Sequence, residues 1–157
     1  MPTTMNALEL KVPPLALACA FALAMWLATT QAPTLAFELP AHGIIAALIA
    51  GLGACLGLVA GLGFRRAGTT VTPTKPQATT SVGAPGGYRI SRNPRNVGVL
   101  LVLAGWAAYL SHVLPFLFLP AYVGYMNRFQ IAPEERMLAA RFGTGYEHYL
   151  RRVRRWL

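Results

Sequence analysis

Charged residues are scarce in this chain of 157 residues, and acidic residues are the scarcest of them. Only 12% of the residues are charged, with 5 Asp and Glu against 14 Lys and Arg, while 55% are hydrophobic. A soluble globular domain has about 25% charged residues, so the composition excludes that class and indicates an integral membrane protein. The net charge of +9 would indicate nucleic-acid binding in a soluble chain, but its distribution indicates another cause.

Cysteine is equally rare, since Cys19 and Cys55 are the two in the chain. Both fall inside long apolar runs, where a single cysteine is usually a small packing residue. Two cysteines so placed supply neither a metal site nor a disulfide framework, and we predict no metal site.

Three long apolar runs define the predicted fold. Residues 12–30 and 41–64 each reach the roughly 20 residues that a bilayer-spanning helix needs. The third run, 97–126, is too long for one span and is interrupted by Ser111, His112 and Pro115. We therefore predict a hairpin of two helices over 94–129. The whole chain is predicted to be one all-α integral membrane domain with four transmembrane helices.

The first run has a second interpretation. Thr30, Gln31 and Ala32 resemble the small-residue cleavage site that follows a secretory signal peptide. The segment before the run is only weakly basic, and the run is long for a signal peptide. A retained membrane anchor is therefore favoured.

Basic residues are spread unevenly between the predicted spans. Lys11 precedes the first span, six Lys and Arg lie within 65–95, and seven follow the fourth span. The connections around Glu38 and His112 contain none. The positive-inside rule therefore predicts that both termini and the middle loop, 65–93, face the cytoplasm. The alanine-rich composition is typical of bacteria, so we expect a multi-pass protein of a bacterial inner membrane.

Glycines recur at a spacing of four in the second span, where Gly53, Gly57 and Gly61 share one helical face. Small residues let helices approach closely in lipid. The run also resembles a nucleotide-binding glycine fingerprint, but that motif needs a preceding strand and a βαβ unit. We predict helix packing, either within the chain or in a dimer, and the oligomeric state stays open.

Polar residues gather directly before the third span, in GGYRISRNPRNVG at 86–98. Asn93 and Pro94 are typical of a helix N-cap and a first helical position, so a helix is predicted to begin there. Arg92 and Arg95 could also extend to lipid phosphates.

The C-terminal segment, 133–157, begins with Pro133, Glu134 and Glu135. These residues are typical of a first helical turn, where the helix dipole favours negative charge. Gly143 is predicted to end that helix. A second, basic and amphipathic helix that suits a bilayer surface is predicted to follow, and its apolar stripe contains Tyr146, Tyr149, Leu150, Val153 and Leu157.

Taken together, RRAGTTVTP (65–73), GGYRISRNPRNVG (86–98), PEERMLAARFGTGYEHYLRRVRRWL (133–157) and the hairpin between the last two resemble the isoprenylcysteine carboxyl methyltransferase and phospholipid methyltransferase superfamily. The resemblance covers about the C-terminal two-thirds of the chain. It implies that the cytosolic half binds S-adenosylmethionine without a Rossmann fold and methylates a lipophilic or lipid-linked small acceptor. The implied partners are that acceptor and membrane lipids. Asn93 stands where the family has His, and Asn96 where it has Tyr, which leaves the acceptor open.

The resemblance implies one site shared by the two polar segments. Arg92 and the start of the third helix suit the carboxylate of the cofactor, Glu134 or Glu135 its ribose hydroxyls or ammonium, and Tyr88 or Tyr146 its adenine. Arg92 and Glu135 are the predicted catalytic residues: an arginine could position an anionic acceptor, and a glutamate could take a proton from an amine. The predicted cofactor-binding residues are Gly87, Tyr88, Arg92, Asn93, Pro94, Asn96, Gly98, Glu134, Glu135, Tyr146 and Tyr149.

A non-enzymatic function is the alternative. The basic C-terminal helix could bind anionic lipid or a partner protein, with each arginine contributing about 1 kcal/mol near the surface. Lipid attraction does not require the ordered pairing of PEER with FGTGYEHY, which favours the methyltransferase. Nucleic-acid binding is disfavoured because membrane spans separate the arginines.

Overall fold

The computed structural model describes residues 12–67 and 91–157. In order, its helices are α1 (Pro14–Gln31), the 3-10 turn η1 (Pro33–Leu35), α2 (His42–Ala67), α3 (Pro94–Leu110), α4 (Val113–Met126), the π-helical turn η4 (Asn127–Ile131), α5 (Ala132–Phe142) and α6 (Thr144–Arg152). Among these residues the pairing of β type is one isolated bridge, Ala36 to His112. The predicted all-α class is confirmed.

Among the described residues, two helices are long and apolar enough to cross a bilayer, Pro14–Gln31 and His42–Leu62. Only 11% and 17% of their most apolar windows are buried, whereas a core helix of a soluble protein is mostly buried. Their apolar outer faces therefore suit a lipid environment. The helices α3 and α4 have 17 and 14 residues, fewer than the roughly 20 of a full span, so the count of four spans stays a prediction.

The hairpin of α3 and α4 turns at Ser111 and His112. Ser111 has a left-handed backbone with φ 47°. His112 is 2% exposed; its Nδ1 accepts the Leu114 N–H at 3.1 Å, and its Nε2 lies 2.8 Å from the Ala32 oxygen. This geometry requires the proton on Nε2, which donates to Ala32. His112 thus caps α4 and joins the two connections at one end of the bundle.

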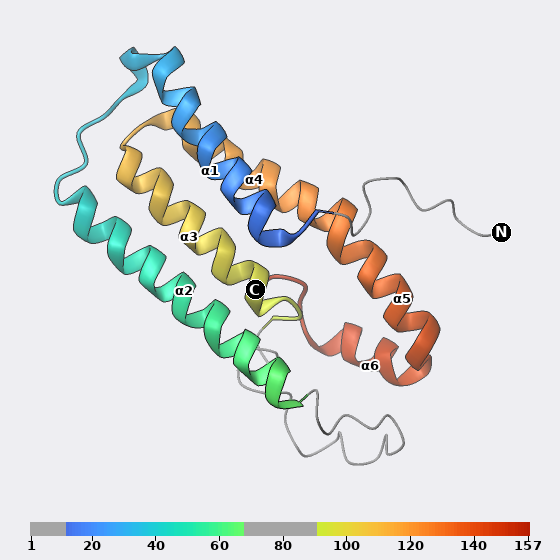
Figure 1. Cartoon of the computed structure of the whole chain (residues 1–157). Coiled ribbons are helices and arrows are strands. Elements are labelled where there is room, and N and C mark those ends of the chain that lie inside the picture. The colour runs from blue at the N-terminus through green and yellow to red at the C-terminus, as the bar shows by residue number, and fades with distance from the viewer. Residues whose placement is uncertain (1–11, 68–90) are drawn as a thin grey trace.

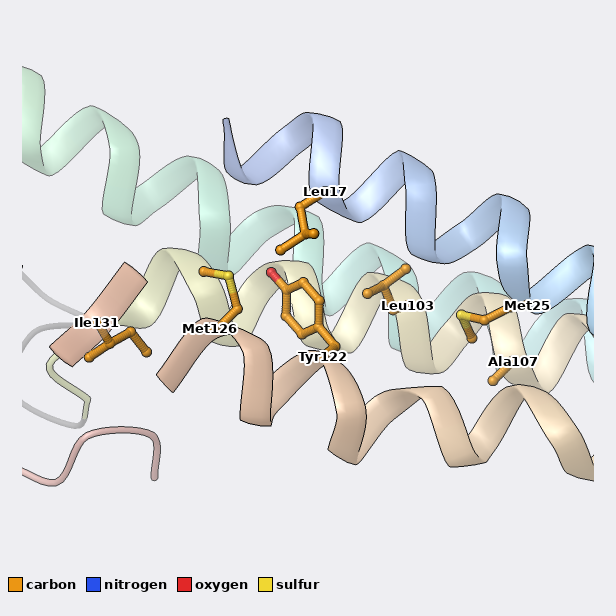
Figure 2. Packing of buried hydrophobic residues seen from close by; sticks show 7 residues of the cluster. All are labelled: Leu17, Met25, Leu103, Ala107, Tyr122, Met126 and Ile131. Atoms are coloured by element: carbon orange, nitrogen blue, oxygen red, sulfur yellow. The ribbon is translucent and has the colours of Figure 1, made fainter. Parts of the chain in front are cut away.

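The core lies between α1, α3 and α4, which run side by side (Figure 1). Figure 2 shows its buried side chains, with the Tyr122 ring between α4 and the other two helices. Phe21 of α1 meets this ring edge-on at 5.4 Å, and the Trp106 indole donates to the Ala22 oxygen at 3.0 Å. The central cluster consists of Leu17, Met25, Leu103, Ala107, Tyr122, Met126 and Ile131.

The helix α2 packs along the outer side of α3 (Figure 1) through small residues. A Cβ added to Gly53 would lie 2.5 Å from the Gly98 oxygen, and one added to Gly98 would lie 2.8 Å from the Gly57 nitrogen. The predicted packing at Gly53 is therefore confirmed. A Cβ on Gly57 or Gly61 would meet no atom of the described residues within 4 Å, so in this part of the chain the predicted packing face does not extend to Gly61.

The sequence predicts that a new helix begins at Pro133, and this prediction is wrong. Instead α4, η4 and α5 form one continuous rod (Figure 1), and the Ala132 N–H donates to the Asn127 oxygen across the wide turn. A proline inside an α-helix lacks a donor and its ring meets the carbonyl four residues earlier. The π turn directly before Pro133 accommodates it.

The last helix is shorter than predicted. It ends at Arg152, and Val153 has an extended backbone with φ −116°, so the predicted helical stripe through Val153 and Leu157 is wrong. The chain end returns to the start of α3 (Figure 1). The helix α2 extends to Ala67, which makes 65–67 helical; the rest of the predicted loop up to residue 90 lies outside the described residues.

Candidate functional site

The start of α3 has a different cap from the predicted one. Asn93 occupies the N-cap position but makes no side-chain capping bond. Its N–H donates to Ser91 Oγ at 3.1 Å, and its carbonyl accepts from the N–H groups of Asn96 and Val97. Pro94 is the first residue of α3, as predicted, and it is buried. The side chain of Ser91 therefore helps to fix the entry of the chain into α3.

Arg92, Glu135 and Arg155 meet in an arginine–glutamate cluster. Arg92 Nη1 lies 2.9 Å from Glu135 Oε1, which Arg155 Nε also contacts at 3.2 Å, while Arg155 Nη2 lies 2.5 Å from Glu135 Oε2. The side chains of Arg92 and Glu135 are 15% and 14% exposed. The sequence predicts that these two residues share a site, and the structure places them in direct contact.

Two arginines on one carboxylate leave the cluster with a net positive charge. Charge-assisted hydrogen bonds of this kind are about twice as strong as neutral ones. The Arg92 Nε is also buried without a hydrogen-bond partner among the described residues, and an unpaired buried donor is unfavourable. The cluster therefore has both charge and donor capacity for one more anionic group.

Tyr146 of α6 lies next to this cluster. Burial raises the pKa of Tyr146 to about 12, the negative charge of Glu135 adds to the shift, and Arg92 opposes it. The ring centre lies 6.1 Å from that of Tyr149. The two predicted tyrosines thus pack together, and the charges of Glu135 and Arg92 act on Tyr146.

A pocket of about 400 Å³ opens between α1 and α5. We call it the α1–α5 pocket. Burial raises the pKa of the Glu134 carboxyl, while Arg95 acts to lower it. The charged residues that line the pocket are Arg95 and Glu134. Each belongs to one of the two polar segments that supply Arg92 and Glu135 to the cluster. The lining comprises Val12, Pro13, Pro14, Arg95, Gln130, Glu134, Met137 and Leu138.

The remaining predicted residues are placed elsewhere. Asn96 is buried, and its Oδ1 has no partner within the described part of the chain. Gly98 faces α2 and serves helix packing. Gly87 and Tyr88 lie outside the described residues. Within residues 12–67 and 91–157, no three His, Cys, Asp or Glu side chains group to hold a metal ion.

Sequence reasoning did not single out Arg155, Ser91, Gln130 or the site role of Arg95. Ser91 had one usable signal, because a hydroxyl two residues before an N-cap often bonds the local backbone. Arg155 is one of several arginines in the tail, and no pattern distinguishes it from its neighbours. Its position depends on the turn after α6.

One similar protein is an uncharacterized protein of Haemophilus influenzae, which is 39% identical over 61 residues. The aligned part covers 97% of that protein and 39% of this chain. The two proteins belong to one family. The description of the relative names no activity, so the family by itself assigns none to this chain. No family model matches the chain, and no solved structure matches it.

Proposed function

We propose that this protein is an S-adenosylmethionine-dependent methyltransferase that acts on a lipophilic or lipid-linked small acceptor. The observation that carries the proposal is the 2.9 Å contact between Arg92 and Glu135. It joins the two polar segments on which the resemblance to membrane methyltransferases rests, although the two residues lie 43 positions apart in the sequence. A purely lipid-anchoring tail does not need this contact.

The residues present fit the charged end of the cofactor. An α-amino acid group presents a carboxylate and an ammonium, and the cluster presents two guanidinium groups and a carboxylate within hydrogen-bond distance of each other. The neighbouring α1–α5 pocket, at about 400 Å³, falls in the usual range of roughly 300–1,000 Å³ for ligand sites. Its apolar lining suits the uncharged parts of a cofactor or an acceptor.

The cofactor, when bound, supplies an electrophilic methyl group on a sulfonium. The chain has to hold the two reactants in line and keep water out, which is where most of the rate of such a transfer arises. Arg92 and Arg155 would bind carboxylate oxygens, and Glu135 would hold an ammonium. The raised pKa of Glu134 makes this carboxyl a better base for an amine acceptor.

The membrane arrangement is part of the proposal. We propose four spans, with α3 and α4 completing the bundle formed with α1 and α2, and both termini on the cytosolic side of a bacterial inner membrane. The exposed arginines Arg95, Arg128, Arg151, Arg152 and Arg154 belong to segments at the end of the bundle that holds the cluster. The opposite end contains Glu38 and the buried His112. This asymmetry follows the positive-inside rule.

Transfer of a labelled methyl group tests the proposed activity. Membranes containing the protein are incubated with methyl-labelled S-adenosylmethionine, and the label is followed into extracted lipids, thiols and amines. We expect incorporation by the wild type and by Arg152→Ala, which removes an exposed arginine outside the cluster. Arg92→Ala and Glu135→Ala should lose about a hundredfold in rate, as expected for lost electrostatic positioning.

A result with no incorporation by any of the four proteins would contradict the proposal. It would favour the non-enzymatic function, in which the exposed arginines at and after the end of α6 bind anionic lipid. Equal incorporation by all four would mean that an enzyme exists but that Arg92 and Glu135 do not serve it.

A further inference from the structure

The last five residues, 153–157, form a non-helical segment that crosses the start of α3. We call this segment the C-terminal strap. The backbone N–H of Arg92 donates to the Arg154 oxygen at 2.9 Å, and Ser91 Oγ donates to the Arg155 oxygen at 3.2 Å. These two bonds attach the strap to the segment that leads into α3. Ser91 is only 2% exposed as a result.

Two side chains of the strap attach it to the α4–α5 rod. Arg155 contacts both oxygens of Glu135, and the Trp156 indole donates to Asn127 Oδ1 at 2.9 Å. The strap therefore joins segments that are far apart in sequence. These contacts are polar and directional, and Trp156 also packs against the hydrophobic core.

Arg155 of the strap occupies part of the cluster, because it contacts both oxygens of Glu135. A carboxylate has about four lone-pair sites, and three donor nitrogens already contact Glu135. A ligand therefore cannot form its full set of hydrogen bonds with Glu135 and Arg92 until one arginine leaves Glu135. Arg155 is the arginine that leaves in the open form, because its side chain is 37% exposed against 15% for Arg92.

We propose that the C-terminal strap is a latch over the arginine–glutamate cluster. In the closed form Glu135 is the anion bound by Arg155. In the open form Arg155 leaves Glu135, and the cluster admits a ligand group that carries a carboxylate or phosphate, with Glu135 free to hold an ammonium. The latch rests on the proposed function for the identity of that ligand alone.

The accessibility of position 91 tests the latch directly. Ser91→Cys is placed in a chain whose native cysteines are replaced by alanine, and its reaction with a sulfonate-bearing thiosulfonate is timed in detergent. The sulfonate serves as an anionic probe of the cluster. We expect slow labelling with the native strap, about tenfold faster labelling when Arg155→Ala is added, and no change when the matched Arg152→Ala is added.

A second measurement avoids the cysteine substitution. Hydrogen exchange of the Arg92 amide, which donates to the strap, should speed up by a similar factor in Arg155→Ala alone and stay at the wild-type rate in Arg152→Ala. Equal labelling and equal exchange with and without Arg155 would overturn the latch.

Adding S-adenosylhomocysteine separates the latch from the proposed function. If both are right, the bound product speeds hydrogen exchange of the Arg92 amide, because a ligand on Arg92 and Glu135 favours the open form of the strap. If the ligand binds to none of the proteins, the proposed function fails, and the labelling and exchange rates without ligand still decide whether the strap is a latch.

Discussion

The side chain of Tyr146 is partly buried beside the charged groups of the cluster. Its phenol lies near one arginine and two glutamates, and burial is the main reason that its pKa rises to about 12. A free tyrosine ionises near 10, so the folded protein favours the neutral phenol. The corresponding stability is fully present below pH 10 and is lost as the pH rises towards 12.

Tyr146→Phe should remove this alkaline loss. Phenylalanine cannot ionise. Between pH 10 and pH 12 the free energy of unfolding should therefore fall less in the variant than in the wild type. This relative gain should be no more than about 1 kcal/mol, since the ring is only half-buried and solvent screens its charge. Denaturation in detergent at pH 8 and pH 11 measures it, and each protein at pH 8 is its own control. An identical difference at both pH values would show that Tyr146 is not held as described.

At the scale of elements, the contact between α2 and α3 depends on the absence of a side chain at three positions. A Cβ on Gly105 would lie 2.8 Å from the Ala46 oxygen, and one on Gly98 would lie 2.6 Å from the Gly53 oxygen. These are backbone atoms, so they cannot move aside unless the helices separate. Close packing of this kind stabilises helix pairs in lipid, where no hydrophobic force drives association.

Gly53→Ala should therefore destabilise the bundle. Its Cβ would lie 2.5 Å from the Gly98 oxygen and 2.9 Å from the Val102 nitrogen, and we expect a loss of about 1–3 kcal/mol, as for other overpacked sites. Gly61→Ala is the matched control, because its Cβ enters open space and alanine favours helix. Unfolding by denaturing detergent measures both. Two variants of equal stability would contradict the described packing.

Apolar runs and caps predict the helices well, because both are local properties. The bounds of α1, the start of α3 at Pro94 and the turn at Ser111 follow from hydropathy, proline and a polar pair. The continuity of α4 into α5 does not, since a π turn before Pro133 depends on how the rod packs. The path of the chain after Arg152 depends on bonds to Ser91, Arg92 and Asn127, which no local pattern shows.

In the candidate site, too, local sequence patterns predict some residues, while others depend on tertiary packing. The resemblance to membrane methyltransferases implies that Arg92 and Glu135 serve one site, and the two side chains are in direct contact. The second arginine, Arg155, was not predicted, because its role arises from the turn after α6. Of the pocket lining, Glu134 is among the predicted site residues, whereas Gln130 and Arg95 are not, since they become neighbours only when the helices assemble.

At the scale of the whole molecule, the chain has one end rich in arginine and another end nearly without charge. The first end combines the cluster, the α1–α5 pocket and the C-terminal strap; the second is joined by His112, which bonds Ala32 and Leu114. The helices between them expose apolar surface, as Leu48 and Leu58 show. This arrangement suits a membrane protein whose chemistry takes place at one bilayer surface.

Calorimetry with S-adenosylhomocysteine, the stable product of the cofactor, tests the central claim most directly. The ligand is titrated into the detergent-purified wild type, Arg92→Ala, Glu135→Ala and the exposed-site control Arg152→Ala. The account predicts binding by the wild type and by the control, and at least roughly tenfold weaker binding by the other two, since each loses a charge-assisted hydrogen bond. Equal affinity in all four proteins, or binding by none, would contradict it.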